Sequence, residues 1–257
     1  MRVTVCQLPH HPHALEAAWT RLGPHLREQG SEWLLLPEFA GADPVWLAPD
    51  FDAAIWQQQV DRAAAWLDRL PELGVRQVVG ARPVTEQGRA YNEGFLWSAD
   101  RGYQRLRRKF HLPDEDGGWE ARWFERGDAQ FPTFDAAGLR FGLNICTELW
   151  ALDTYAGYAT QGVQAVLSPR ATAAATTDKW LALGTVAAVR SGAYSLSSNR
   201  VHEDGSCGGV GWVIDPDGRL LARTSADQPF ATVEIDLQAT ARARHSYPRY
   251  VFAAPAA

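Results

Sequence analysis

Short apolar runs alternate with amphipathic stretches along the chain, and this alternation predicts strands and helices in turn. Apolar and polar positions alternate over residues 2–8, which is typical of a strand with one buried face. Leu15, Trp19, Leu22 and Leu26 then recur at helical spacing, so they should share one face of a helix. The run WLLLP at residues 33–37 predicts a short buried strand that the proline ends.

Later segments add hairpins to this pattern. Strand–turn–strand patterns are expected at residues 91–109, 131–146 and 211–225, the last around a Pro-Asp-Gly turn. A second helical stripe covers residues 56–70, and a third helix is expected to be capped by Thr177 or Asp178. Single strands are expected at residues 75–81, 163–169, 193–199 and 231–236.

Strands therefore outnumber helices, and they are joined partly by hairpins and partly through helices. This arrangement predicts an α/β fold of mixed sheets with helices on the outer faces, and two such sheets packed together make a four-layer α-β-β-α sandwich. No repeat or long linker divides the 257 residues, so residues 1–257 are expected to form one domain. Residues 253–257 (AAPAA) are expected to be a frayed tail.

Composition and charge narrow the function classes. Hydrophobic residues make up 46% of the chain and the net charge is −5, which suits a globular core and gives no support for nucleic acid or an anionic membrane as partner. The longest apolar runs are too short for a membrane span or a signal peptide. The three cysteines are odd in number and far apart, which argues against a disulfide framework. We therefore expect a cytoplasmic protein.

Two chemically useful residues directly follow buried apolar runs. Cys146 comes after GLNI; a lone cysteine is usually a small buried hydrophobe, and it becomes a nucleophile only beside a base or a cation. Glu38 comes after LLLP, where partial desolvation favours a general base, although a loop or cap acid is the ordinary alternative.

Two further charged residues have a functional and an ordinary interpretation. Lys109, in RLRRKFHLP, shares a strand face with Arg107; it either faces an oxyanion or belongs to a charged edge strand. Glu120, taken alone, is typical of a surface acid. A histidine cluster in QLPHHPHAL is interrupted by Pro12 and has no Cys or carboxylate at ligand spacing, so we interpret it as a loop and expect no metal.

Taken together, these motifs resemble the nitrilase superfamily of carbon–nitrogen hydrolases. The resemblance lies in LPE with Glu38, RKxHLP with Lys109 and YNEGFLW upstream, and GLxIC with Cys146. The segment WEARWFERGD is similar to the one that carries the family's second glutamate, here Glu120. The separations of 71 and 37 residues along Glu38, Lys109 and Cys146 are ordinary for the family.

The resemblance implies a mechanism without cofactor. Glu38 takes the proton of Cys146, and the thiolate attacks the substrate carbon. Lys109 and the backbone N–H of Thr147 stabilise the oxyanion, and a thioester forms and is hydrolysed. Glu120 orients Lys109 or the incoming water. The resemblance also implies a homodimer or larger assembly through helices near the site, and Trp150 and Tyr155 fit a buried contact of that kind.

The segment after the nucleophile departs from the family's common pattern. In CTELWALDTYAG, Thr147 stands where many family amidases have an aromatic residue, and the usual Phe-Pro is absent. Because this region shapes the substrate pocket, the substrate class stays open. Trp119 and Trp150 are candidate substrate contacts.

Arg170, in VLSPRAT, is a third candidate substrate contact. The resemblance puts it in a loop just past a strand, near the pocket mouth, where it could bind a substrate carboxylate bidentately. The alternative is a surface arginine paired with Glu148 or Asp178.

Four functions remain to be weighed. A small-molecule amide hydrolase is favoured. A true nitrilase uses the same residues, and an acid two positions after the cysteine, Glu148, points slightly that way. A Cys–His protease would need His111, His202 or His245, but Cys146 lacks the local signatures of those families. A non-catalytic binding protein on the same fold is disfavoured by the intact set of Glu38, Lys109 and Cys146.

Overall fold

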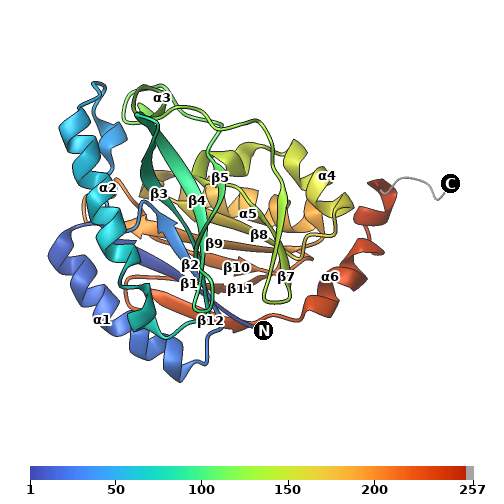
Figure 1. Cartoon of the computed structure of the whole chain (residues 1–257). Coiled ribbons are helices and arrows are strands. Elements are labelled where there is room, and N and C mark those ends of the chain that lie inside the picture. Colours follow the sequence, from blue (N-terminus) through green and yellow to red (C-terminus); the bar gives the residue numbers. More distant parts are fainter. Residues whose placement is uncertain (253–257) are drawn as a thin grey trace.

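The computed structural model describes residues 1–252, so the expected tail at 253–257 lies outside the described residues. Strands and helices alternate along the chain as the sequence predicts (Figure 1). The strands are β1 (Arg2–Pro9), β2 (Trp33–Glu38), β3 (Gln77–Glu86), β4 (Arg89–Ser98), β5 (Gly102–Arg108), β6 (Thr133–Ala136), β7 (Leu139–Leu143), β8 (Ala165–Arg170), β9 (Tyr194–Val201), β10 (Trp212–Ile214), β11 (Leu220–Arg223) and β12 (Phe230–Glu234). The α-helices are α1 (Pro12–Glu28), α2 (Ala53–Leu67), α3 (Glu120–Trp123), α4 (Asp153–Thr160), α5 (Thr177–Ser191) and α6 (Leu237–Arg244).

The strands form two mixed halves that are joined through β1. The hydrogen-bonded order is β5-β4-β3-β2-β1-β9-β8-β7-β6. The first part of β1 pairs with β2 in parallel, and its last part, from Gln7 to Pro9, pairs with β9 in parallel. The antiparallel pairs come from β3–β4–β5, β6–β7 and β9–β10–β11, and from β12, which pairs with the first part of β1. The expected α-β-β-α sandwich is confirmed, with the refinement that one strand belongs to both halves.

Alternation within each strand divides the core into layers. On β2, Trp33 and Leu35 face the layer between the two halves, while Leu34 and Leu36 face α1. On the other half, Leu167 of β8 belongs to the central layer. Helices α4 and α5 cover the outer face of that half, and α1 covers the outer face of the first (Figure 1). The period of two in the sequence therefore sets the four layers.

The two halves approach very closely at Gly94 on β4. A Cβ atom added there would lie 2.4 Å from Cδ2 of Leu143 and 3.3 Å from Cδ1 of Ile145. Leu143 ends β7, and Ile145 directly precedes Cys146. A methyl group at this position would have to displace the buried side chain of Leu143 or shift β4 itself.

Three local predictions need correction. Pro37 does not end β2, which continues to Glu38; the proline is tolerated because the pairing with β3 is irregular between Leu35 and Glu38. Thr177 and Asp178 do not cap α5, since Thr176 precedes it and makes no side-chain cap. Helices α4 and α6 are present but were not predicted from the sequence pattern.

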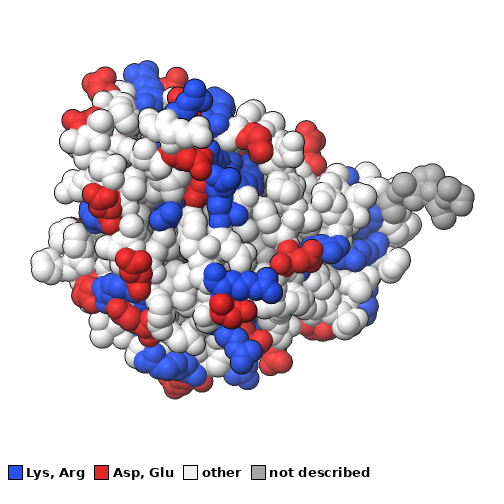
Figure 2. All heavy atoms as spheres, in the orientation of Figure 1, with Lys and Arg blue, Asp and Glu red and all other residues white. Residues whose placement is uncertain are grey.

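Surface charge is mixed. Figure 2 shows Lys and Arg side chains interspersed with Asp and Glu side chains over the face that it displays. Exposed ion pairs such as Arg140–Asp135 are typical of this surface. Among residues 1–252, no helix has the length and apolar character that crossing a membrane requires.

Candidate active site

Four predicted residues meet in one buried cluster. Glu38 ends β2, Lys109 follows β5, Glu120 begins α3 and Cys146 begins the 3-10 helix η3 (Cys146–Trp150). Their exposed fractions are 1%, 0%, 4% and 4%. The Lys109 ammonium lies 2.9 Å from Oε1 of Glu38 and 2.8 Å from Oε1 of Glu120. The structure therefore places one ammonium between two carboxylates.

Strand direction explains this meeting. Strands β2 and β3 run parallel, as do β7 and β8, so the residues that follow β2 and β7 emerge at the carboxyl ends of the two halves. Cys146 has a φ of 49°, in the left-handed region that non-glycine residues seldom adopt. Such a backbone turn costs on the order of 1 kcal/mol and is often found at functional positions.

The charges of the cluster are strongly coupled. Burial by itself lowers the pKa of Lys109, but the carboxylates of Glu120 and Glu38 outweigh burial and hold that pKa above its ordinary value. Burial raises the pKa of Glu120 to about 7, although the Lys109 ammonium opposes this. The ammonium is therefore permanently charged, whereas Glu120 titrates near neutrality.

The Cys146 thiol is protonated at rest. Burial and the nearby Glu38 carboxylate raise the pKa of Cys146, while Lys109 and a hydrogen bond donated by the backbone N–H of Ala171 act in the other direction. A thiol of this kind attacks an electrophile only if a base takes its proton during the attack. Glu38 is the carboxylate with the larger effect on the thiol, which fits that task.

Two residues that the motifs did not assign complete the surroundings of Lys109 and Cys146. Glu148 is fully buried and forms an ion pair with buried Arg107. Its carboxylate also accepts the backbone N–H groups of Phe110 at 2.7 Å and Ile145 at 2.9 Å. Two features of the sequence could have indicated this pair. Arg107 shares a strand face with Lys109, and Glu148 is an acid two residues after Cys146.

Asn92 is the second unassigned residue. It lies on β4 within the motif YNEGFLW, and its side-chain amide donates a hydrogen bond to Oε1 of Glu38 at 2.7 Å. Its backbone carbonyl accepts the N–H of Lys109 at 2.9 Å. The sequence marked the motif as similar to the family, but it showed no partner for this side chain.

The predicted pocket residues lie around this cluster in different settings. Thr147 is the second residue of η3, directly after Cys146. Trp119 precedes α3, is partly buried and donates its backbone N–H to Trp46. Trp150 ends η3 with 50% of its surface exposed and contacts Trp180 edge-on.

Arg170 does not lie in a loop at the pocket mouth. It is the last residue of β8 and is 1% exposed, so the surface alternative is wrong too. Its guanidinium donates to the Ser197 hydroxyl, the Thr172 hydroxyl and the Val210 carbonyl, and it lies over the Trp212 ring. No carboxylate within residues 1–252 forms an ion pair with it. Burial lowers the pKa of Arg170 to about 9.

Tyr155 is likewise misplaced by the sequence prediction. It is fully buried inside α4, and its hydroxyl donates to the backbone carbonyl of Leu149. A side chain held in this way belongs to the core between α4 and α5 rather than to a contact between subunits.

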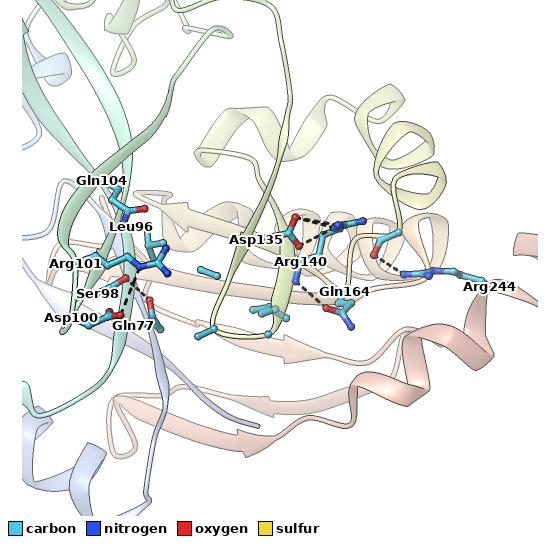
Figure 3. Close-up of a pocket in the computed structure, with 15 residues that line it drawn as sticks. Gln77, Leu96, Ser98, Asp100, Arg101, Gln104, Asp135, Arg140, Gln164 and Arg244 are labelled. Atoms are coloured by element: carbon cyan, nitrogen blue, oxygen red, sulfur yellow. Dashed lines mark hydrogen bonds and ion pairs between the residues drawn. The ribbon is translucent and has the colours of Figure 1, made fainter.

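A cavity of about 570 Å³ lies far from this chemistry (Figure 3). It is lined by the start of β3, the β4–β5 turn and the β6–β7 hairpin, including Gln77, Arg101 and Arg140. These segments lie at the opposite end of β3 and β7 from Glu38 and Cys146. The cavity therefore does not belong to the cluster described above.

Comparisons with known proteins show the family to which the chain belongs. Residues 2–245 match the family model described as carbon-nitrogen hydrolase. The chain is 25% identical over 232 residues to the omega-amidase NIT2 of Mus musculus, covering 86% of this chain and 82% of that protein. It is 24% identical over 178 residues to an N-carbamoylputrescine amidase of Solanum lycopersicum, covering 62% and 59%.

Solved structures show the same fold. A carbon-nitrogen hydrolase from Helicobacter pylori G27 superposes with a TM-score of 0.83 at 19% identity, covering 98% of this chain and 94% of that one. An amidase from Nesterenkonia sp. AN1, solved with the acetamide moiety of fluoroacetamide added at its active-site cysteine, superposes with a TM-score of 0.77 at 22% identity, covering 94% and 92%. The family match across the chain confirms the resemblance seen in the motifs: the protein belongs to the carbon–nitrogen hydrolase family, within the nitrilase superfamily, and is an enzyme of that class.

Proposed function

We propose that this enzyme hydrolyses the non-peptide C–N bond of a small-molecule amide through a thioester on Cys146. The observation that carries the proposal is the Lys109 ammonium, held between the carboxylates of Glu38 and Glu120 beside a buried thiol. This set contains a nucleophile, a base and a cation for an oxyanion. Amidase relatives support the substrate class, since those proteins carry that activity in their names.

In the first half-reaction the thiol becomes a thioester. Glu38 takes the proton of Cys146 as sulfur attacks the carbonyl carbon, and the C=O electron pair moves to oxygen. Lys109 and the backbone N–H of Thr147 stabilise that oxyanion; losing one such donor commonly costs about 10²–10³ in rate. Glu38 then gives the proton to nitrogen, the C–N bond breaks, and ammonia or an amine leaves.

In the second half-reaction water replaces sulfur. Glu38 takes a proton from water as the water oxygen attacks the thioester carbon. The C–S bond breaks, the thiolate recovers the proton, and the carboxylic acid leaves. Glu120 holds Lys109 in place and contacts the ammonium through both carboxylate oxygens, at 2.8 and 2.7 Å. No step in this sequence requires a metal or an organic cofactor.

The position of Glu148 no longer favours nitrile hydrolysis over amide hydrolysis. Glu148 suggested a nitrilase because of its position two residues after Cys146. In the structure its carboxylate is engaged by Arg107 and two backbone N–H groups, which is a structural task common to either substrate. The amide is therefore the proposed substrate class.

We also propose a homodimer built on the face around α5. Four large apolar side chains on α5 and on the segments that contact it are exposed: Trp150, Val186, Tyr250 and Phe252. Trp150 contacts Trp180 of α5, and Phe252 lies against Arg190 of the same helix. Light scattering is expected to give twice the chain mass of 28.4 kDa, and the monomer mass at micromolar concentration would contradict the dimer.

The activity test compares three substrate panels. Ammonia release is measured from short amides, carbamoyl compounds and nitriles, and intact mass is measured after mixing enzyme with each active substrate. We expect release from amides and an acyl adduct on Cys146. In Glu38→Gln the adduct should form far more slowly; formation at the wild-type rate would show that Glu38 is not the base, and release from nitriles alone would contradict the amidase proposal.

A further inference from the structure

The amide of Asn92 and the ammonium of Lys109 share one oxygen of Glu38. Nδ2 of Asn92 donates to Oε1 at 2.7 Å, and Nζ of Lys109 donates to the same atom at 2.9 Å. A carboxylate oxygen has two lone pairs, so these donors occupy Oε1. Oε2 is buried and has no hydrogen-bond partner within residues 1–252. The two oxygens of one carboxylate are thus unequal.

We propose that Asn92 is the positioning residue of the general base: it fixes Glu38 so that Oε2, and not Oε1, exchanges the proton with Cys146, the leaving nitrogen and water. This inference rests on the proposed function and deepens it. In each exchange the O–H bond forms on Oε2 as the S–H or water O–H bond breaks. The proton later leaves Oε2 for nitrogen or sulfur.

Lys109 alone would not make this choice between oxygens. An ammonium is a compact charge with three rotatable donors, and it attracts either oxygen of a carboxylate equally well. The terminal torsion of a glutamate is broad, so an ammonium alone would let the plane of the carboxylate turn over a wide range of angles. The planar amide of Asn92 adds a second, directional contact. Together the two contacts fix the plane of the carboxylate, and with it the direction in which the free oxygen points.

Asn92 is itself held firmly. It is 1% exposed on β4 and pairs with Pro83 of β3. Its carbonyl accepts the backbone N–H of Lys109, so the residue that orients the base also anchors the backbone of the ammonium. One side chain and its own backbone therefore contact two members of the catalytic cluster.

The test compares an amide with an activated ester of the same acyl group in Asn92→Ala. An amide nitrogen must receive a proton from Glu38 to leave, whereas nitrophenolate leaves without one. Loss of the positioned Oε2 should therefore reduce amide acylation by about 10- to 100-fold, within the range that a general acid–base contributes, with KM changed less than about 3-fold. The nitrophenolate burst should fall less than amide acylation, because the ester still needs Oε2 to take the thiol proton but needs no proton on its leaving group.

Ser98→Ala is the matched control. Ser98 lies on the same strand, is buried and donates a hydrogen bond to Gln77 at the far end of the sheet, so its loss should lower stability without changing the amide-to-ester ratio. Asn92→Leu keeps the approximate side-chain volume and removes the donor; it replaces Asn92→Ala if the latter does not fold, with the same expected result.

Equal losses for amide and ester, or amide acylation within about 3-fold of wild type, would overturn the inference about Asn92. Failure of the proposed function looks different: the wild-type protein would then form no acyl adduct on Cys146 with any amide. The wild-type acylation experiment is therefore run first, and it separates the two outcomes.

Discussion

Glu148 and Arg107 form a buried ion pair that connects the segment of Cys146 to the segment of Lys109. One oxygen of Glu148 accepts the N–H of Phe110, the residue after Lys109, and the other accepts the N–H of Ile145, the residue before Cys146. A single carboxylate thus sets the distance between two backbones that come from different halves of the sandwich.

Glu148→Gln should impair stability and turnover together. The substitution keeps the size of the side chain but leaves the Arg107 charge buried without its partner, which typically costs about 3–5 kcal/mol. We expect a lower urea midpoint and a loss of at least about 10-fold in kcat/KM for an amide under conditions where the variant stays folded. The exposed pair Arg140–Asp135 offers the control: Arg140→Gln should change little. Equal midpoints for the two variants would contradict the bridging role.

Cys146→Ala should abolish turnover and leave the fold intact. Loss of a nucleophile usually costs several orders of magnitude in rate, whereas removing one buried sulfur atom changes packing only slightly. Ammonia release and a thermal melt measure the two effects. Cys207→Ala, another buried free cysteine, should keep the wild-type rate. If Cys146→Ala retains more than about a tenth of that rate, Cys146 is not the nucleophile.

Glu120→Gln should flatten the dependence of stability on pH in the acidic range. The pKa of Glu120 rises from an ordinary 4.5 to about 7 in the folded protein, so the native state binds this proton more tightly than the unfolded chain does. The associated stability is fully present below pH 4.5 and is lost as the pH rises through 7. We expect the free energy of unfolding of the wild type, relative to Glu120→Gln, to fall across that window. Parallel curves from urea titrations at several pH values would refute the assignment.

Arg170→Lys should slow charged and neutral amides by the same factor. All three guanidinium nitrogens of Arg170 already donate to protein groups, so its replacement loosens the segment that includes Ala171 rather than removing a substrate contact. The measurement is kcat/KM for a short ω-amide of a dicarboxylic acid and for a neutral amide of equal length. A selective loss with the anionic amide, together with a raised KM, would restore Arg170 as a substrate-binding residue.

The sequence predicted the strands well and singled out residues that the structure brings together, and both have a physical reason. Period-two patterns mark buried strands, and Glu38 and Cys146 stand where such patterns end, so local information places them at one edge of the sandwich. Lys109 and Glu120 were identified through motifs that resemble a family, because their shared surroundings are not visible in local patterns.

The contacts that orient these residues could not be read in the same way. Asn92 reaches Glu38 across 54 residues, and Arg107 reaches Glu148 across 41, so each partner is determined by the topology rather than by neighbours in the chain. Arg170 was misplaced for a related reason. A cation after an apolar run suggests exposure, but hydroxyl and carbonyl groups from distant segments satisfy it inside the core.

The close approach at Gly94 links the spacing between the two halves to the position of the Cys146 segment. A Cβ atom at this glycine would meet Leu143 and Ile145, which precede Cys146 in the chain, while Lys109 follows β5, the strand paired with β4. A single methyl group at position 94 would occupy space between the halves that the Leu143 side chain now fills. We expect the displaced side chains of Leu143 and Ile145 to disturb the adjoining segment of Cys146, so tolerance to mutation should be narrow at positions such as Gly94 that lie outside the cluster itself.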